Sequence, residues 1–305
     1  MTGTIIPATD GYPLGATVHR PDKSGNSSNV AIINCATGVK AAYYSRYARF
    51  LAAHGYTAIT YDYRGIGASR PESLRKLQAS KFDWGNKDFA GVLNWAAREF
   101  PAARIAVVGH SIGGVVPGFS ASSARIDRML TVGAQFAYWK DYAPRARYPM
   151  FLKWHIFMPL VTRLMGYFPG RRLGWLEDLP AGVAYEWAFR KATLGAEPGG
   201  SANAHALAPD TDPARYFPTL RCPMLAYSIT DDPYATPAAV RRLLAYYTGC
   251  ERSYVLVRPE ELHLPSIGHF AFFHDRFRDT LWRETLAWLD GGPAPRAVVQ
   301  HFAAG

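Results

Sequence analysis

The sequence has few cysteines and lacks the spacings that hold metals or nucleotides. Its three cysteines are Cys35, Cys222 and Cys250, and no C-x-x-C pair occurs among them. This pattern favours free thiols in a reducing compartment over a disulfide framework. Histidines and carboxylates do not cluster at metal-ligand spacing, and no G-x-G-x-x-G follows an early strand. We therefore expect no metal and no other cofactor.

The chain also lacks any signal for export or for membrane insertion. Residues Met1 to Asp10 contain neither a basic region nor an apolar one, so no signal peptide is expected. The longest apolar stretch, Tyr148 to Met165, is interrupted by Lys153, His155 and Arg163 and is too short and too charged to span a bilayer. The expected location is the cytoplasm. For this stretch, packing within the protein is favoured over contact with a membrane surface.

Charge is the one marked bias of the composition. Lysine and arginine exceed the acidic residues, which gives a net charge of +10, but they are scattered along the chain. No zinc-finger spacing, RNP-like aromatic motif or basic helix accompanies them, so nucleic acid is not expected as a partner. An anionic substrate or an acidic lipid surface is compatible with this charge.

Apolar runs alternate with amphipathic segments along most of the chain. This alternation predicts an α/β fold, in which a mostly parallel twisted sheet carries helices on both faces. The expected strands are Val30–Asn34, Tyr56–Tyr61, Ile105–Val108, Met129–Val132, Met224–Ile229 and Tyr254–Arg258. The expected helices are Tyr44–His54, Lys87–Phe100, a helix from Gly113 onward, Pro237–Tyr247 and Phe272–Leu289.

The alternation breaks down in one long segment. Residues 138–210 are rich in Trp, Tyr, Pro, Arg and Met, and their helical patterns are short. We interpret this segment as a helical lid inserted between two parts of a core domain, residues 1–137 and 211–290. The residues after Gly291 begin Gly-Gly-Pro-Ala-Pro, which predicts a turn-rich, mobile tail over 291–305.

A G-x-S-x-G motif occupies Gly109 to Gly113, directly after the strand ending at Val108. In this context the motif forms a sharp strand-to-helix turn that exposes the serine hydroxyl, and its glycines let neighbouring backbone pass closely. A helix beginning there would add a favourable dipole for developing negative charge. Ser111 is therefore the candidate nucleophile.

An acid and a base follow the serine along the chain, each after a predicted strand. Asp231 and Asp232 follow Met224–Ile229, and Asp232 is favoured because it directly precedes a proline. The base is expected at His269, in a loop before the last helix, rather than at the nearby His263 or His274. The carboxylate would orient the imidazole and stabilise its cationic form.

An oxyanion hole requires two backbone N–H donors. Ile112, after the nucleophile, is the first candidate, and Ala36, in the loop after the first predicted strand, is the second. Five residues are candidates for the substrate pocket because they adjoin these motifs or belong to the aromatic insertion: Thr37, His110, Trp139, Trp175 and Tyr234.

Together these motifs resemble the α/β-hydrolase superfamily. The segment Asp62–Ser69 is similar to the D-x-R-G-x-G-x-S turn of that superfamily, and the resemblance extends from about Val30 to Leu289. The closest resemblance is to a group of bacterial α/β-hydrolase-like serine hydrolases, through Gly166–Gly174, Asp178–Gly182 and Asp231–Pro237. It implies the fold and a Ser–His–Asp triad, with Asn34-Cys35 standing where His-Gly is common. It implies no substrate.

The expected function is hydrolysis of a carboxylic ester, or a related acyl bond, through an acyl-enzyme on Ser111. The expected partner is a small acyl substrate. An acyltransferase with an alcohol or amine acceptor would use the same residues, and a non-catalytic binding protein is an alternative from another class. The sequence leaves the oligomeric state open.

Overall fold

The computed structural model describes residues 1–21, 28–195, 212–296 and 298–304. These residues form a nine-stranded sheet in the order β1-β2-β4-β3-β5-β6-β9-β10-β11. The six strands from β4 to β10 in this order run parallel, and antiparallel strands extend both edges. The predicted α/β architecture is therefore present.

The parallel strands are short and almost fully buried, as expected for a sheet covered on both faces. Their bounds are β3 Asn29–Asn34, β4 Tyr56–Tyr61, β5 Arg104–His110, β6 Arg128–Val132, β9 Met224–Ile229 and β10 Arg252–Val257. Each predicted strand lies within two residues of an observed one. The amino-terminal hairpin of β1, Thr2–Pro7, and β2, Pro13–His19, was not predicted.

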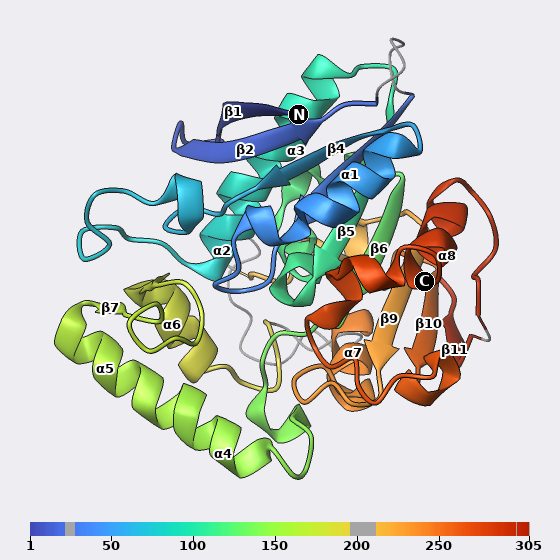
Figure 1. Ribbon diagram of the computed structural model, residues 1–305. Coiled ribbons are helices and arrows are strands. Elements are labelled where there is room, and N and C mark those ends of the chain that lie inside the picture. Colours follow the sequence, from blue (N-terminus) through green and yellow to red (C-terminus); the bar gives the residue numbers. More distant parts are fainter. Residues whose placement is uncertain (22–27, 196–211, 297, 305) are drawn as a thin grey trace.

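Helices cover both faces of the sheet (Figure 1). α1, Ser45–Ala53, and α8, Leu281–Leu289, lie together on one face, where Tyr47 and Trp282 meet edge to face at 5.2 Å. α3, Ala90–Glu99, lies on the other face. It continues a helical segment that begins at α2, Lys81–Asp83, and passes through a π-helical stretch, so the predicted helix starts earlier than Lys87.

The carboxyl-terminal part differs from prediction in two places. The segment expected to be one helix from Phe272 consists of two 3₁₀ turns, Ala271–Phe273 and Asp275–Phe277, before α8. The tail, expected to be mobile, contains β11, Gln300–Phe302, paired antiparallel with β10. An edge strand offers unpaired backbone groups, and the Gly-Gly-Pro turn lets the chain return to bind them.

Of the segment predicted to be an insertion, the structure describes residues 138–195, and its end at 196–210 lies outside the described residues. A continuous helical rod forms its outer edge: α4, Arg147–Phe151, a π-helical stretch, Leu152–Phe157, and α5, Met158–Met165. A small hairpin of β7, Tyr167–Phe168, and β8, Leu179–Pro180, leads to α6, Ala181–Ala188. After it the core resumes, with α7 at Pro237–Leu244.

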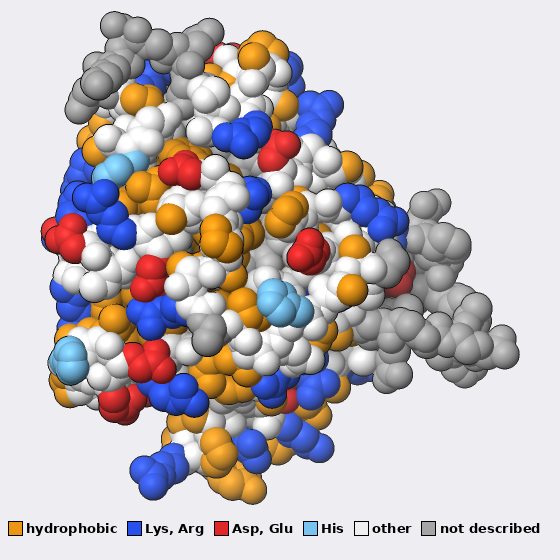
Figure 2. Space-filling view, turned by 90° about the vertical axis from the view of Figure 1, so that its right-hand side faces the viewer, with side chains coloured by type: hydrophobic (Ala, Val, Ile, Leu, Met, Phe, Trp, Pro, Cys, Tyr) orange, Lys and Arg blue, Asp and Glu red, His pale blue; other side chains and the backbone are white. Residues whose placement is uncertain are grey.

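The charged side chains on the surface are distributed as in the sequence. Lys and Arg side chains are spread over the face in Figure 2 among acidic and apolar ones rather than gathered into one patch. In the described part of the chain, no helix combines the length and the apolarity needed to cross a bilayer. Cys35, Cys222 and Cys250 are all buried free thiols.

Candidate active site

Ser111 lies at the carboxyl end of β5 in a strained backbone conformation. Its φ is +55°, a left-handed value that is costly for a residue with a side chain and that is common at functional sites. The turn is possible only because its neighbours are glycines. A Cβ on Gly113 would lie 2.2 Å from the carbonyl oxygen of Asn34, and one on Gly109 would lie 2.5 Å from that of Gly113.

The chain after Ser111 does not form the predicted helix. Three 3₁₀ turns follow instead, at Ser111–Gly114, Val116–Phe119 and Ala121–Arg125. Consecutive glycines and Pro117 explain the difference, because they weaken or break an α-helix. The helix dipole expected at Ser111 is therefore absent, because only a short 3₁₀ turn begins there.

His269 and Asp232 form a short, buried hydrogen bond. His269 Nδ1 lies 2.7 Å from Asp232 Oδ2, and the Asp232 side chain is fully buried. Because a carboxylate can only accept, Nδ1 carries a proton, and in the neutral imidazole Nε2 is then the acceptor. Burial raises the pKa of Asp232, but the His269 charge and hydrogen bonds from His269, Ala235 and Tyr234 outweigh it and lower this pKa overall.

The neighbouring carboxylate, Asp231, has a different set of contacts. Its two oxygens accept the backbone N–H groups of Ile267 and Gly268, each at 2.9 Å. These contacts hold the loop that carries His269. The structure thus separates the two candidates that the sequence left open, because only Asp232 contacts the imidazole.

Gly133, the first residue after β6, packs against the His269–Asp232 pair. Its φ is +56°, and a Cβ there would lie 3.0 Å from Asp232 Oδ2 and 3.3 Å from His269 Nδ1. The close approach of this backbone fixes one side of the pair. Sequence reasoning did not identify this position, although a glycine directly after a strand end is a usable signal.

His110 does not line the pocket, in contrast to the sequence expectation. It is fully buried, with Nε2 2.8 Å from the His269 carbonyl oxygen and Nδ1 2.7 Å from Tyr44 Oη. The carbonyl can only accept, so Nε2 donates and the Tyr44 hydroxyl donates to Nδ1. Burial, reinforced by the His269 charge, lowers the pKa of His110 to about 3, which keeps this brace neutral.

The backbone amide of Ala36, predicted as the second oxyanion donor, already has a partner. It donates to Tyr44 Oη at 2.9 Å, so it is not free in this structure. Thr37 is the next residue along, and among the hydrogen bonds of the described residues none involves its amide. Ile112 and Thr37 both line the cavity that contains Ser111.

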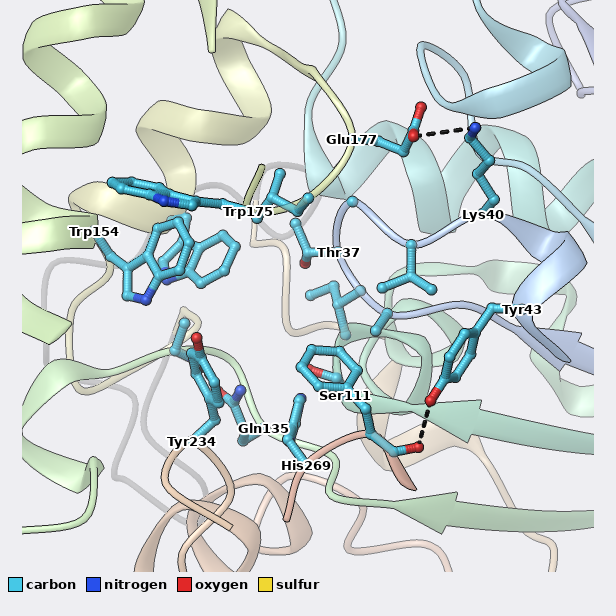
Figure 3. A pocket seen from close by; sticks show the side chains of 18 of the residues that line it. Thr37, Lys40, Tyr43, Ser111, Gln135, Trp154, Trp175, Glu177, Tyr234 and His269 are labelled. Carbon is cyan, nitrogen blue, oxygen red and sulfur yellow. Dashed lines mark hydrogen bonds and ion pairs between the residues drawn. The ribbon is translucent and has the colours of Figure 1, made fainter. Parts of the chain in front are cut away.

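A cavity of about 590 Å³ joins the core to the insertion. Ser111, His269 and Gln135 line it from the core, and Trp154, Trp175 and Trp187 line it from the insertion (Figure 3). The predicted pocket residues Thr37, Trp175 and Tyr234 belong to its wall. Trp139 does not, because its ring packs on Phe151 of α4 instead.

Sequence reasoning missed several residues of this wall. Lys81 precedes the expected helix at Lys87, and Lys153 was noted only as an interruption of an apolar run. Trp154 and Trp187 were recorded as part of the aromatic insertion but were not assigned to the pocket. Aromatic content was the available signal for the tryptophans, whereas nothing local marks Lys81. In the described part of the chain, no three His, Cys, Asp or Glu residues are grouped to hold a metal.

Comparisons with known proteins agree with this fold. A model of the family described as the alpha/beta hydrolase family matches residues 30–290. An esterase from Exiguobacterium antarcticum is similar in structure, with 15% identity, a TM-score of 0.58 and coverage of 95% of this chain and 100% of the other.

Two further solved structures show the same likeness. A monoglyceride lipase from Saccharomyces cerevisiae has 16% identity, a TM-score of 0.67 and coverage of 95% and 96%. An esterase from Pyrococcus furiosus has 14% identity, a TM-score of 0.60 and coverage of 95% and 91%. Identities this low establish a shared fold. No curated protein matches the chain in sequence.

Proposed function

The chain belongs to the alpha/beta hydrolase family, and from this premise we propose that it is a serine hydrolase cleaving a carboxylic ester or related acyl bond. The observation that carries the proposal is the His269 Nδ1–Asp232 Oδ2 hydrogen bond of 2.7 Å beside a cavity that also contains Ser111. The positive φ of Ser111 supports a role for its hydroxyl beyond packing.

In the proposed reaction, Ser111 Oγ attacks the acyl carbon while its proton passes to His269 Nε2. The negatively charged Asp232 stabilises the resulting imidazolium. The oxygen of the tetrahedral intermediate accepts hydrogen bonds from the amides of Ile112 and, in place of Ala36, Thr37. His269 then gives its proton to the leaving alcohol. Water, activated by His269, hydrolyses the acyl-enzyme and frees Ser111.

A fluorophosphonate probe and p-nitrophenyl esters test this proposal directly. We expect the probe to label the wild-type protein at Ser111, and Ser111→Ala to lose both labelling and turnover while its circular dichroism is unchanged. Ser122→Ala is the matched control, because this serine lies outside the cavity. Turnover that survives in Ser111→Ala, or a wild-type protein that is not labelled, would overturn the proposal.

A further inference from the structure

The cavity wall contributed by the insertion is built from three tryptophans. Trp154 stacks on Trp187 with ring centres 4.6 Å apart, and Trp175 meets Trp154 edge to face at 5.6 Å. Figure 3 shows Trp154 and Trp175 across the cavity from Ser111 and His269. A substrate with its acyl carbon at Ser111 would therefore extend its apolar body toward these rings.

Two lysines flank the tryptophans and line the same cavity. Lys153 Nζ lies 3.8 Å from the ring centre of Trp175 and 4.5 Å from that of Trp154. Lys81 Nζ lies 5.0 Å from the ring centre of Trp187. These cation–π contacts hold both ammonium groups against the aromatic wall.

Among the described residues, neither ammonium group has an ion-pair partner. In the described ranges of the chain, no carboxylate oxygen lies within 4.0 Å of Nζ of Lys81 or Lys153, whereas Lys40, at the same cavity, pairs with Glu177 at 3.2 Å. Glu186 approaches Lys81, but its carboxylate accepts a hydrogen bond from the Lys81 backbone N–H. Lys81 is buried, and a buried cation without a partner is costly, so an anion that enters the cavity beside it is stabilised there.

The electrostatic surroundings of Lys81 agree with an unfilled anion site. Its side chain is only 2% exposed. Burial, together with the Arg190 charge, lowers the pKa of Lys81 to about 7 against the opposing effect of Glu186. An anion bound beside Nζ would favour its protonated form. The net charge of +10 would also raise the local concentration of anionic ligands.

We propose that the substrate is an ester whose acyl part carries a carboxylate, with its apolar body on Trp154, Trp175 and Trp187 and its carboxylate between Lys81 and Lys153. This inference rests on the proposed ester hydrolysis and adds the substrate class. The cavity volume of about 590 Å³ lies within the usual range for small-molecule sites, about 300–1,000 Å³.

Matched ester pairs test the inference. The mono-p-nitrophenyl esters of adipic and suberic acid carry a distal carboxylate, and p-nitrophenyl hexanoate and octanoate are their neutral counterparts of equal chain length. We expect the wild-type protein to have the higher kcat/KM for the anionic member of at least one pair. Lys81→Met and Lys153→Met should each reduce that value about tenfold or more while changing the neutral ester less than about threefold.

Two control variants separate charge from packing. Lys153→Arg keeps the charge and should retain most of the preference for the anionic ester. Lys76→Met removes an exposed lysine outside the cavity and should leave both esters unchanged. A wild-type protein that cleaves the neutral esters equally well or better, or lysine variants that lose both esters to the same extent, would overturn the inference.

Fluorophosphonate labelling of Ser111 distinguishes the two ways to fail. If the wild-type protein is not labelled and cleaves neither ester, the proposed function has failed, and the inference fails with it. If labelling and neutral ester cleavage are intact without any preference for the carboxylate, the inference alone has failed. Equal labelling rates in the wild type and in both methionine variants would show that these substitutions leave the nucleophile in place.

Discussion

At the scale of single residues, the two adjacent aspartates give the sharpest prediction. Asp232→Asn replaces the acceptor of the His269 Nδ1 proton by an amide that can hold the wrong tautomer, and we expect kcat to fall by about 10³–10⁴. Asp231→Asn keeps an oxygen for one of its two backbone donors, so kcat should fall less than about tenfold. Ester kinetics of the two variants, with matched circular dichroism, measure the contrast.

A larger loss of kcat in Asp231→Asn than in Asp232→Asn would contradict the assignment of Asp232 as the catalytic acid, because it would make Asp231 the partner of the imidazole. The unfolding free energy of Asp231→Asn serves as a control, because it shows how far the substitution loosens the loop that carries His269. Asp231→Asn should lose about 1 kcal/mol, since one of its two hydrogen bonds to the loop remains.

Sequence motifs identified the residues whose role is marked by their immediate neighbours in the sequence. Ser111 follows from its glycines, and Asp232 and His269 follow from their places after strands. The contacts of His110 and Ala36 with Tyr44 were not predicted, because the fold brings these residues together. Tyr44 and His110 are 66 positions apart. A hydrogen bond across that separation leaves no periodic trace in the sequence, so a buried brace cannot be distinguished from a pocket residue by position alone.

At the scale of elements, the alternation of strands and helices was predictable, and the lengths of the helices were not. The helix expected after Ser111 consists of short 3₁₀ turns, and the final helix begins at Leu281 rather than Phe272. Glycine, proline and tertiary contacts compete with helical periodicity at these places. The strand bounds were predicted more accurately than the helix bounds. Strands of a parallel sheet are buried on both faces, so they appear in the sequence as continuous β-branched and aromatic runs.

The helical rod of the insertion has distinct inner and outer faces. Met150, Trp154, Met158 and Thr162 are buried, whereas an apolar row spaced by four residues faces outward: Tyr148, Leu152, Ile156, Leu160 and Leu164. A step of four residues overshoots one α-helical turn, and the wider π-helical turn at Leu152–Phe157 offsets this drift. The row therefore stays on one face, although its composition suggested a buried stretch.

A pair of matched truncations tests this division of the rod. Met158 is 0% exposed and Leu160 is 59% exposed, so Met158→Ala should lower the unfolding free energy by about 2–4 kcal/mol and Leu160→Ala by less than about 0.5 kcal/mol. Urea denaturation followed by tryptophan fluorescence measures both. Equal losses in the two variants would mean that the outer row is packed in solution.

At the scale of the whole molecule, the core is a general scaffold and the insertion completes the cavity. The parallel sheet brings Ser111, Asp232 and His269 to one end, because the carboxyl ends of parallel strands share an edge. The sequence predicted this arrangement from its order of motifs. It predicted only part of the cavity wall, namely Thr37, Trp175 and Tyr234. It did not predict Trp154, Trp187 and the two lysines, because their approach depends on the packing of the entire insertion.

The buried Lys81 predicts how the stability of the whole protein depends on pH. Its pKa is about 7 in the folded protein against 10.5 for a free lysine, so the unfolded chain binds more protons between these values. Stability therefore rises with pH in this window, by at most about 1.4 kcal/mol per pH unit from one group. Burial raises the pKa of the Cys35 thiol well above 9.0, which opposes the trend at higher pH. The contribution of Lys81 is therefore best measured between pH 7 and pH 9.

Comparison with Lys81→Met isolates this contribution from all other titrating groups. We expect the unfolding free energy of the wild type, measured in urea at pH 7, 8 and 9, to rise relative to that of the variant at each step. The variant should be the more stable protein at pH 7, because it no longer buries an ammonium group that has no ion-pair partner in the described part of the chain. This advantage should shrink toward pH 9. A pH-independent difference between the two proteins would mean that Lys81 titrates alike in the folded and unfolded chain. In that case the cavity would not penalise the cation, and the electrostatic basis for recognising an anionic substrate there would be lost.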